Sequence, residues 1–119
     1  NVTEIEDGAF YSCSELTSID LPSKVATIGK LVFSDCTAVT SIHLPAKVAA
    51  IGEKAFAIMY AVTNIKCDAV QPPKLGKSVF ERIGEDHEGK KVKLTVPKNS
   101  KTAYSKVDQW KDFDIAEKQ

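Results

Sequence analysis

Ile28-Gly29-Lys30-Leu31-Val32-Phe33 decides the fold of this 119-residue chain, because close copies of it stand on either side. One copy precedes it as Ile5-Glu6-Asp7-Gly8-Ala9-Phe10 and another follows it as Ile51-Gly52-Glu53-Lys54-Ala55-Phe56, so the sequence has a period of 23. A fourth copy, Leu75-Gly76-Lys77-Ser78-Val79-Phe80, arrives one residue late. A fixed period between about 20 and 50 residues is typical of a solenoid, in which each coil buries its apolar side against its neighbours.

The second half of the unit repeats with the same period. Residues 16–22, Leu-Thr-Ser-Ile-Asp-Leu-Pro, correspond to residues 39–45 and 62–68. Their alternation predicts a short strand with one buried face, which proline ends because it has no backbone N–H to donate. We expect a second extended stretch at residues 25–28 and 48–51. The spacing of three in residues 9–16 predicts a short helical or 3₁₀ turn.

The pattern changes after Phe80. Residues 81–91 are polar and contain two glycines, which predicts an exposed loop. Leu94 then takes the strand position of Ile19, but the sequence separation from Phe80 to Leu94 is 14, whereas that from Phe10 to Ile19 is nine. The loop therefore carries an insertion of five residues.

Residues 97–119 are predicted to form a cap. Ser100 has the character of a helix N-cap, and terminal coils of solenoids need an atypical element over their last apolar face. We expect a solenoid at residues 1–96 and a cap at 97–119, within one domain. The residues predicted to be buried in the cap are Ala103, Tyr104, Val107, Trp110 and Phe113.

The bulk composition excludes several classes of function. Sixteen basic and sixteen acidic residues cancel, so the chain has no net field to attract nucleic acid or an anionic membrane. The sequence contains no apolar run of about 18 residues, which argues against membrane insertion. With 43% hydrophobic and 27% charged residues, the composition is that of a globular domain.

The repeated unit resembles the BspA-like (Treponema pallidum type) bacterial leucine-rich repeat. Residues 96–113 also look like the C-terminal cap of Bacteroidetes members. The third unit departs from the pattern, with Met59, Cys67 and Asp68 in place of Cys, Leu and Pro, and this predicts a less regular coil. The residues that carry the likeness are Ile5, Gly8-Ala9-Phe10, Cys13, Leu16, Ile19, Leu21 and Pro22, with their copies near 28–45 and 51–67.

The resemblance implies an α/β, β-rich leucine-rich-repeat solenoid of about four right-handed coils, each corresponding to one period of the sequence. It implies a short parallel sheet, helical turns opposite the sheet, and a C-terminal capping helix. It also implies an extracellular or cell-surface protein that takes part in adhesion, bacterial aggregation or other binding, with no catalytic residues. Since Val2 aligns with Val25 inside the repeat, we expect the chain to be N-terminally truncated.

The three cysteines are predicted to be structural. Cys13 and Cys36 share a repeat position that Met59 fills in the next unit, so apolar volume is what the position requires. We expect buried free thiols, with a Cys13–Cys36 disulfide as the alternative in an oxidising compartment. Cys67 takes a leucine position and is expected to be buried. The cysteines lack the Cys-x-x-Cys spacing of a zinc site, and we expect no metal and no cofactor.

No catalytic constellation is predicted. Strand alternation places His43 outward and Cys67 inward, so they cannot act as base and nucleophile. Residues 86–88, Asp-His-Glu, read as a solvated loop and not as a metal cluster. The sequence has no general acid–base pair, phosphate-binding glycine loop or nucleophile elbow, so we expect no enzyme, and a hydrolase is the weakest hypothesis.

The outward side of the strands is the candidate binding surface. Its side chains differ between copies of the repeat, whereas the apolar positions stay apolar. A recognition surface requires such variation, but a solvated surface with no partner also permits it. The candidate surface lacks the Trp, Tyr and Arg that dominate binding hot spots, which predicts modest affinity for each coil. Alternation assigns two columns to it: Ser18, Ser41, Asn64 and Lys93 in one, and Asp20, His43, Lys66 and Thr95 in the other.

Two functions therefore remain open. The first is a non-catalytic module that binds a host or bacterial surface protein or a glycan through these columns. The second is a structural spacer with no ligand of its own. We also expect possible self-association through an uncovered first coil near Val2, Ile5 and Phe10, because unpaired strand edges favour pairing with another chain.

Overall fold

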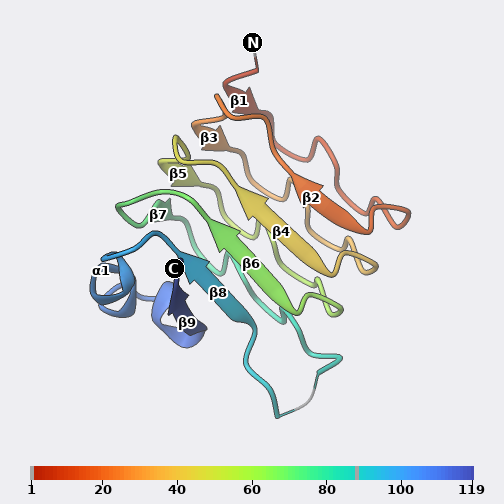
Figure 1. Ribbon diagram of the computed structural model, residues 1–119. Coiled ribbons are helices and arrows are strands. Elements are labelled where there is room, and N and C mark those ends of the chain that lie inside the picture. The colour runs from red at the N-terminus through yellow and green to blue at the C-terminus, as the bar shows by residue number, and fades with distance from the viewer. Residues whose placement is uncertain (1, 88) are drawn as a thin grey trace.

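The computed structural model describes residues 2–87 and 89–119, which wind into a β-solenoid with two parallel sheets (Figure 1). Asn1 and Glu88, which belong to the predicted solenoid and loop, lie outside the described residues. The first sheet contains β1 (Glu4–Ile5), β3 (Thr27–Ile28), β5 (Ala50–Ile51) and β7 (Lys74–Leu75), in that order. The second sheet contains β2 (Ser18–Asp20), β4 (Ser41–Leu44), β6 (Asn64–Cys67), β8 (Lys93–Val96) and β9 (Asp114–Glu117), in that order.

Both extended stretches of the repeat are confirmed as strands, and their register follows the sequence period. In the second sheet Ile19 pairs with Ile42, Ile42 with Ile65, and Ile65 with Leu94. These four side chains are all buried, at 5% exposed or less, so equivalent residues stack in columns between the two sheets. The five-residue insertion before Leu94 does not disturb this register, because it lies in the loop and not in the strand.

The remaining side of each coil is a series of turns, not the predicted short helix. The N–H of Tyr11 donates to Gly8 O at 3.1 Å, a bond of the 3₁₀ type, but alternate N–H groups donate to the next coil instead. Gly8 and Ser12 also adopt positive φ angles of 68° and 56°, which end a right-handed helix. The prediction of a short helix was wrong, because a spacing of three fits turns as well, and its 3₁₀ alternative holds only as single i→i−3 bonds within these turns.

These bonds between coils form what we call the turn ladder. Every N–H in it points toward the C-terminal end of the stack and every carbonyl toward the N-terminal end. Its bonds are 2.7–3.1 Å long. The donor→acceptor pairs are Gly8→Lys30, Phe10→Val32, Ser12→Ser34, Leu31→Glu53, Phe33→Ala55, Asp35→Ala57, Lys54→Lys77, Phe56→Val79 and Ile58→Glu81.

Inside the turns, the phenylalanines of the repeat form a continuous stack. The ring centroids of Phe10 and Phe33 are 5.4 Å apart, as are those of Phe33 and Phe56, and Phe56 lies 5.9 Å from Phe80. The rings are within 12° of parallel, because each is carried by the same backbone one coil further along. Offset stacking of this kind adds to the free energy gained by burial.

The loop at residues 81–91 is bound to the third coil. The N–H of Gly84 donates to Met59 O, and the N–H of Asp86 donates to Tyr60 O, both at 2.9 Å. The His87 ring lies 3.1 Å from Ala61 O through Nε2. The prediction that this loop is exposed is correct for most of the loop's described side chains, but Ile83 is half-buried.

The C-terminal segment, residues 97–119, contains α1 (Lys101–Ser105), a 3₁₀ turn η1 (Trp110–Asp112) and β9. The helix ends before Val107, which is 36% exposed, so the prediction that Val107 is buried was wrong. Ser100 stands at the N-cap, but its hydroxyl donates to Val70 O at 2.9 Å instead of capping the helix. Strand β9 pairs in parallel with β8 and was not foreseen.

Candidate functional site

The predicted outward columns exist as two rows across the second sheet. Neighbouring strands place the members of each column opposite one another, so the rows cross β2, β4, β6 and β8 nearly perpendicular to the strands. All eight side chains are exposed or half-buried. The register pairs are Ser18–Ser41, Ser41–Asn64 and Asn64–Lys93 in one row, and Asp20–His43, His43–Lys66 and Lys66–Thr95 in the other.

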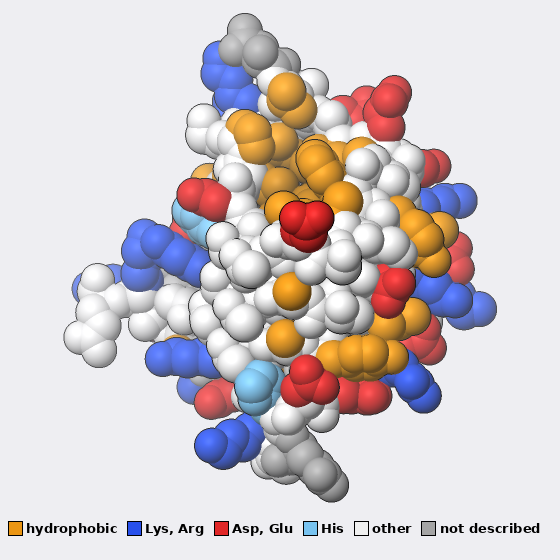
Figure 2. Space-filling view, turned by 90° about the vertical axis from the view of Figure 1, so that its right-hand side faces the viewer, with side chains coloured by type: hydrophobic (Ala, Val, Ile, Leu, Met, Phe, Trp, Pro, Cys, Tyr) orange, Lys and Arg blue, Asp and Glu red, His pale blue; other side chains and the backbone are white. Residues whose placement is uncertain are grey.

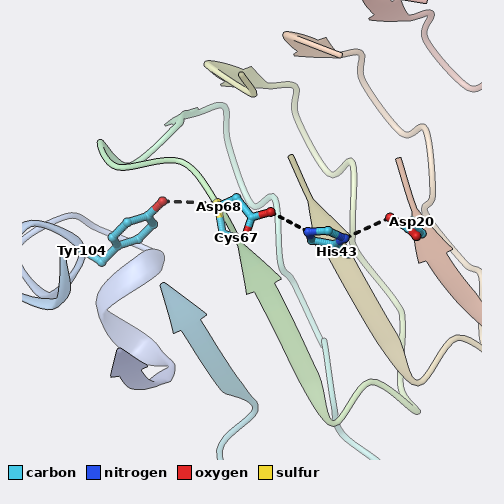
Figure 3. A network of polar contacts seen from close by, with 5 residues as sticks. All are labelled: Asp20, His43, Cys67, Asp68 and Tyr104. Atoms are coloured by element: carbon cyan, nitrogen blue, oxygen red, sulfur yellow. Dashed lines mark hydrogen bonds and ion pairs between the residues drawn. The ribbon is translucent and has the colours of Figure 1, made fainter. Parts of the chain in front are cut away.

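His43 forms the centre of a bridge between three coils (Figure 3). Its Nδ1 lies 2.9 Å from Asp20 Oδ1, and its Nε2 lies 2.7 Å from Asp68 Oδ2. A carboxylate can only accept, so both contacts are hydrogen bonds when both ring nitrogens carry a proton. The bridge then holds one cation between two anions. The side chain of His43 is 35% exposed and that of Asp68 30%, which leaves the bridge partly open to a partner.

Asp68 belongs to this bridge but was not among the predicted candidate residues. It stands where the first two units have Pro22 and Pro45, and it had been interpreted only as an irregularity. Because it is not proline, its N–H donates to Leu44 O at 3.0 Å, which extends the sheet by one bond. Its side chain falls on the outward face, two residues beyond Lys66, and reaches His43 of the preceding coil. The available signal was a charged residue at a proline position beside an outward histidine.

A shallow depression adjoins the bridge. It has a volume of about 480 Å³, and both carboxylates of the bridge line it together with Lys24 and Lys47. Charges of both signs therefore lie close together around His43. A surface of this kind favours a polar, charge-complementary partner and can orient it.

The inner face of the same strands carries no accessible nucleophile. Cys67 is 1% exposed, and its Sγ lies 3.2 Å from the hydroxyl of Tyr104. That hydroxyl donates its proton to Ala69 O at 2.6 Å, so the thiol is the donor in the contact with Tyr104. Burial raises the pKa of the Cys67 thiol and also that of Tyr104. The prediction that His43 and Cys67 do not pair is confirmed.

The other two cysteines are free in the structure, like Cys67. Cys36 is fully buried as predicted, and its Sγ donates to Phe10 O at 3.2 Å. Cys13 is only half-buried, so the prediction of a buried thiol was wrong there. Within residues 2–87 and 89–119, no group of three or more His, Cys, Asp or Glu side chains is placed to hold a metal ion.

The first coil exposes apolar side chains. Val2 is 52% exposed, Phe10 41% and Tyr11 55%. Figure 2 shows hydrophobic side chains gathered on the turn side of the molecule, toward the end that holds the N terminus. Ile5, in contrast, is buried, because its side chain points between the two sheets, so its predicted exposure was wrong. Self-association through this coil stays a prediction.

Geometry and sequence comparison define the same class of protein, a parallel solenoid of leucine-rich repeats. The family described as "BspA type Leucine rich repeat region (6 copies)" matches residues 3–107. The chain belongs to this family, whose members are generally non-enzymatic repeats that mediate protein binding and are typically associated with the cell surface.

No curated protein matches the chain significantly. In the part of the chain that the structure describes, none of the helices has the length and apolar character needed to cross a membrane.

Proposed function

We propose that this chain is a non-catalytic binding module of an exported or cell-surface protein, and that the outward face of β2, β4, β6 and β8 contacts the partner. The observation that carries the proposal is the bridge of Asp20, His43 and Asp68. Three separate coils contribute to it, and the sheet register fixes its geometry before any partner arrives. Pre-organised polar groups lose little entropy on binding.

A protein partner fits this face better than a glycan. The face offers carboxylates, an imidazole and lysines, but neither column contains a Trp, Tyr or Phe side chain, the residues on which sugar rings usually stack. Charge pairs at the edge of an interface contribute mainly to specificity and association rate. The affinity of this segment alone is therefore expected to be modest. A role in adhesion or host interaction follows if the partner is a surface protein.

The same lack of aromatic and arginine side chains supports a second candidate, a spacer with no ligand of its own. Hot spots are enriched in Trp, Tyr and Arg, and neither outward column has one. The two candidates differ in one respect. A binding module loses its partner when the face is altered, whereas a spacer does not.

The test is a pair of variants that both preserve net charge. Asp20→Lys with Lys66→Glu reverses two charges on the proposed face, and Glu4→Lys with Lys74→Glu does the same on the other sheet. The chain, and any longer protein that contains it, is profiled against arrays of surface proteins and glycans. We expect the face variant to weaken binding about tenfold or more and the control to stay within about twofold. Unchanged binding of the face variant to every partner found, or no partner at all, would favour the spacer.

A further inference from the structure

A groove lies at the C-terminal end of the stack, away from the proposed binding face. Its volume is about 650 Å³, and it runs between the last turn of the repeat and residues 108–113. The apolar side chains of Phe80, Ile83 and Phe113 line it. Lysines stand around it, namely Lys77, Lys90 and Lys91.

The turn ladder ends at this groove. Every inner coil donates alternate N–H groups to the carbonyls of the coil that follows. In the last coil the equivalent donors are the N–H groups of Ser78, Phe80 and Arg82, and none of them has an acceptor among the described residues. Ser78 and Phe80 line the groove. An unpaired row of backbone donors is a template for another segment of backbone.

The chain itself shows that this edge accepts an amide from outside the ladder. Gln109, which also lines the groove, accepts a hydrogen bond from the N–H of Val79 at 2.7 Å through Oε1. Its Nε2 donates to Gly76 O at 2.8 Å. One side-chain amide thus inserts into the turn and bridges Val79 N–H and Gly76 O, whose equivalents in the preceding coil, Ala55 N–H and Gly52 O, bond directly at 3.2 Å. The ladder donors on either side of Val79, the N–H groups of Ser78 and Phe80, are left without an acceptor among the described residues.

We propose that this groove binds an extended peptide segment of a partner protein, with acidic residues flanking an apolar one. Two carbonyls of the peptide, two residues apart, accept from the N–H groups of Ser78 and Phe80, as Lys77 O and Val79 O accept from the preceding coil. An apolar side chain of the peptide contacts Ile83 and Phe113. The mode is strand addition, in which backbone bonds give affinity and side-chain contacts give specificity.

The charges around the groove favour acidic flanks. Lys77, Lys90 and Lys91 form no ion pair with any described residue. Of the three acidic residues that line the groove, Asp108 is already paired with Lys111 at 3.1 Å. Glu81 and Asp112 remain, so among the described residues that line the groove the three lysines outnumber the unpaired carboxylates. The complementary peptide therefore carries negative charge.

The probe is the blocked peptide Ac-Asp-Val-Asp-Leu-Asp-NH2, titrated into the ¹⁵N-labelled chain. We expect saturable binding with a Kd between about 0.1 and 1 mM, with the amide signals of Ser78 and Phe80 shifting and their hydrogen exchange slowing. Lys90→Glu with Lys91→Glu should weaken binding about fivefold. The matched control, Lys98→Glu with Lys106→Glu, changes two exposed lysines of the C-terminal segment that do not line the groove, and it should stay within about twofold.

Three results would overturn the proposal. One is equal binding of the lysine counterpart Ac-Lys-Val-Lys-Leu-Lys-NH2, and another is shifts confined to residues outside the groove. The third is concentration-dependent self-association that Lys90→Glu with Lys91→Glu abolishes, since the occupant would then be a second copy of this chain. The charge-reversal pair on the sheet face, Asp20→Lys with Lys66→Glu, leaves peptide binding unchanged if the two sites are independent.

Discussion

The apolar core is covered in two different ways, by neighbouring coils in the middle of the stack and by the C-terminal segment at its end. Phe33 has a nearly parallel ring on each face, because the neighbouring coils place Phe10 and Phe56 there by repetition. Phe80 has Phe56 on one face, but on the other it meets Trp110 at 57° and Phe113 at 84°. A segment that does not repeat covers the last apolar face with side chains of another shape. It replaces the aromatic stack and continues the second sheet through β9, but it leaves the N–H groups at the end of the turn ladder without an acceptor among the described residues.

Trp110→Ala should have the largest effect on stability, because it removes the main side chain of this non-repeating closure. Trp110 is fully buried, lies 5.1 Å from Phe80, and donates through Nε1 to Pro73 O at 2.9 Å. Loss of the ring and of that bond should lower the free energy of unfolding by about 5 kcal/mol. Urea titration followed by circular dichroism measures it. The exposed neighbour change Val107→Ala should stay below about 1 kcal/mol. A loss under about 1.5 kcal/mol for Trp110→Ala would mean that the last coil does not need this cover.

Phe56→Ala tests the repeating region in the same way. Phe56 is fully buried between Phe33 and Phe80, so removal of its ring leaves a cavity with aromatic walls on both sides. We expect a loss of about 4 kcal/mol. The matched change is Phe10→Ala, at a ring that is 41% exposed and has one stacked neighbour, and its loss should be about 1 kcal/mol. Equal losses at the two positions would show that the stack does not stabilise its inner members more than its first one.

Most of the repeat could be predicted from the sequence, since a fixed period with constant apolar columns leaves parallel stacking as the way to bury them. The turns were harder to predict. A spacing of three suits a helix as well as turns, and the choice depends on donors shared between coils, which one coil cannot reveal. The bridge at His43 was missed for a related reason. Asp68 belongs to the next coil, and its importance depends on which outward residue lies beside it after stacking.

Gly52→Ala tests how closely the coils approach one another. A Cβ on Gly52 would stand 2.7 Å from the backbone carbon of Gly29 in the preceding coil, so two segments of backbone would have to move apart. Overpacking of this kind should lower the free energy of unfolding by about 3 kcal/mol. Gly8→Ala is the control, because its φ is 68° but no atom outside Gly8 and its two chain neighbours lies within 4 Å of the added carbon, and strain alone should amount to about 1 kcal/mol. Thermal unfolding of the two variants separates the effect of crowding from that of backbone strain. If Gly52→Ala lost less stability than Gly8→Ala, the close stacking of the coils would be contradicted.

The smallest effect expected is a loss of stability at alkaline pH, at the junction between the third coil and the C-terminal segment. Burial raises the pKa of Cys67 in the folded chain, so the thiol stays protonated there while it ionises in the unfolded chain. Stability is therefore complete below the unfolded pKa of about 8.5 and declines as pH rises above it toward the folded value. Tyr104, whose pKa is raised by burial as well, adds a second decline above about pH 10.

Urea titrations at pH 7, 9 and 10.5 measure both declines. Cys67→Ala should reduce the decline between pH 7 and 9 and keep the one above about pH 10. Val107→Ala is the matched control, because it changes an exposed side chain of the C-terminal segment that has no titratable group, and it should leave the pH profile unchanged. If Cys67→Ala and the unaltered chain lost stability equally up to pH 9, the buried contact between Cys67 and Tyr104 would not hold the thiol protonated. The junction would then be more open to water than the repeating coils on which it rests.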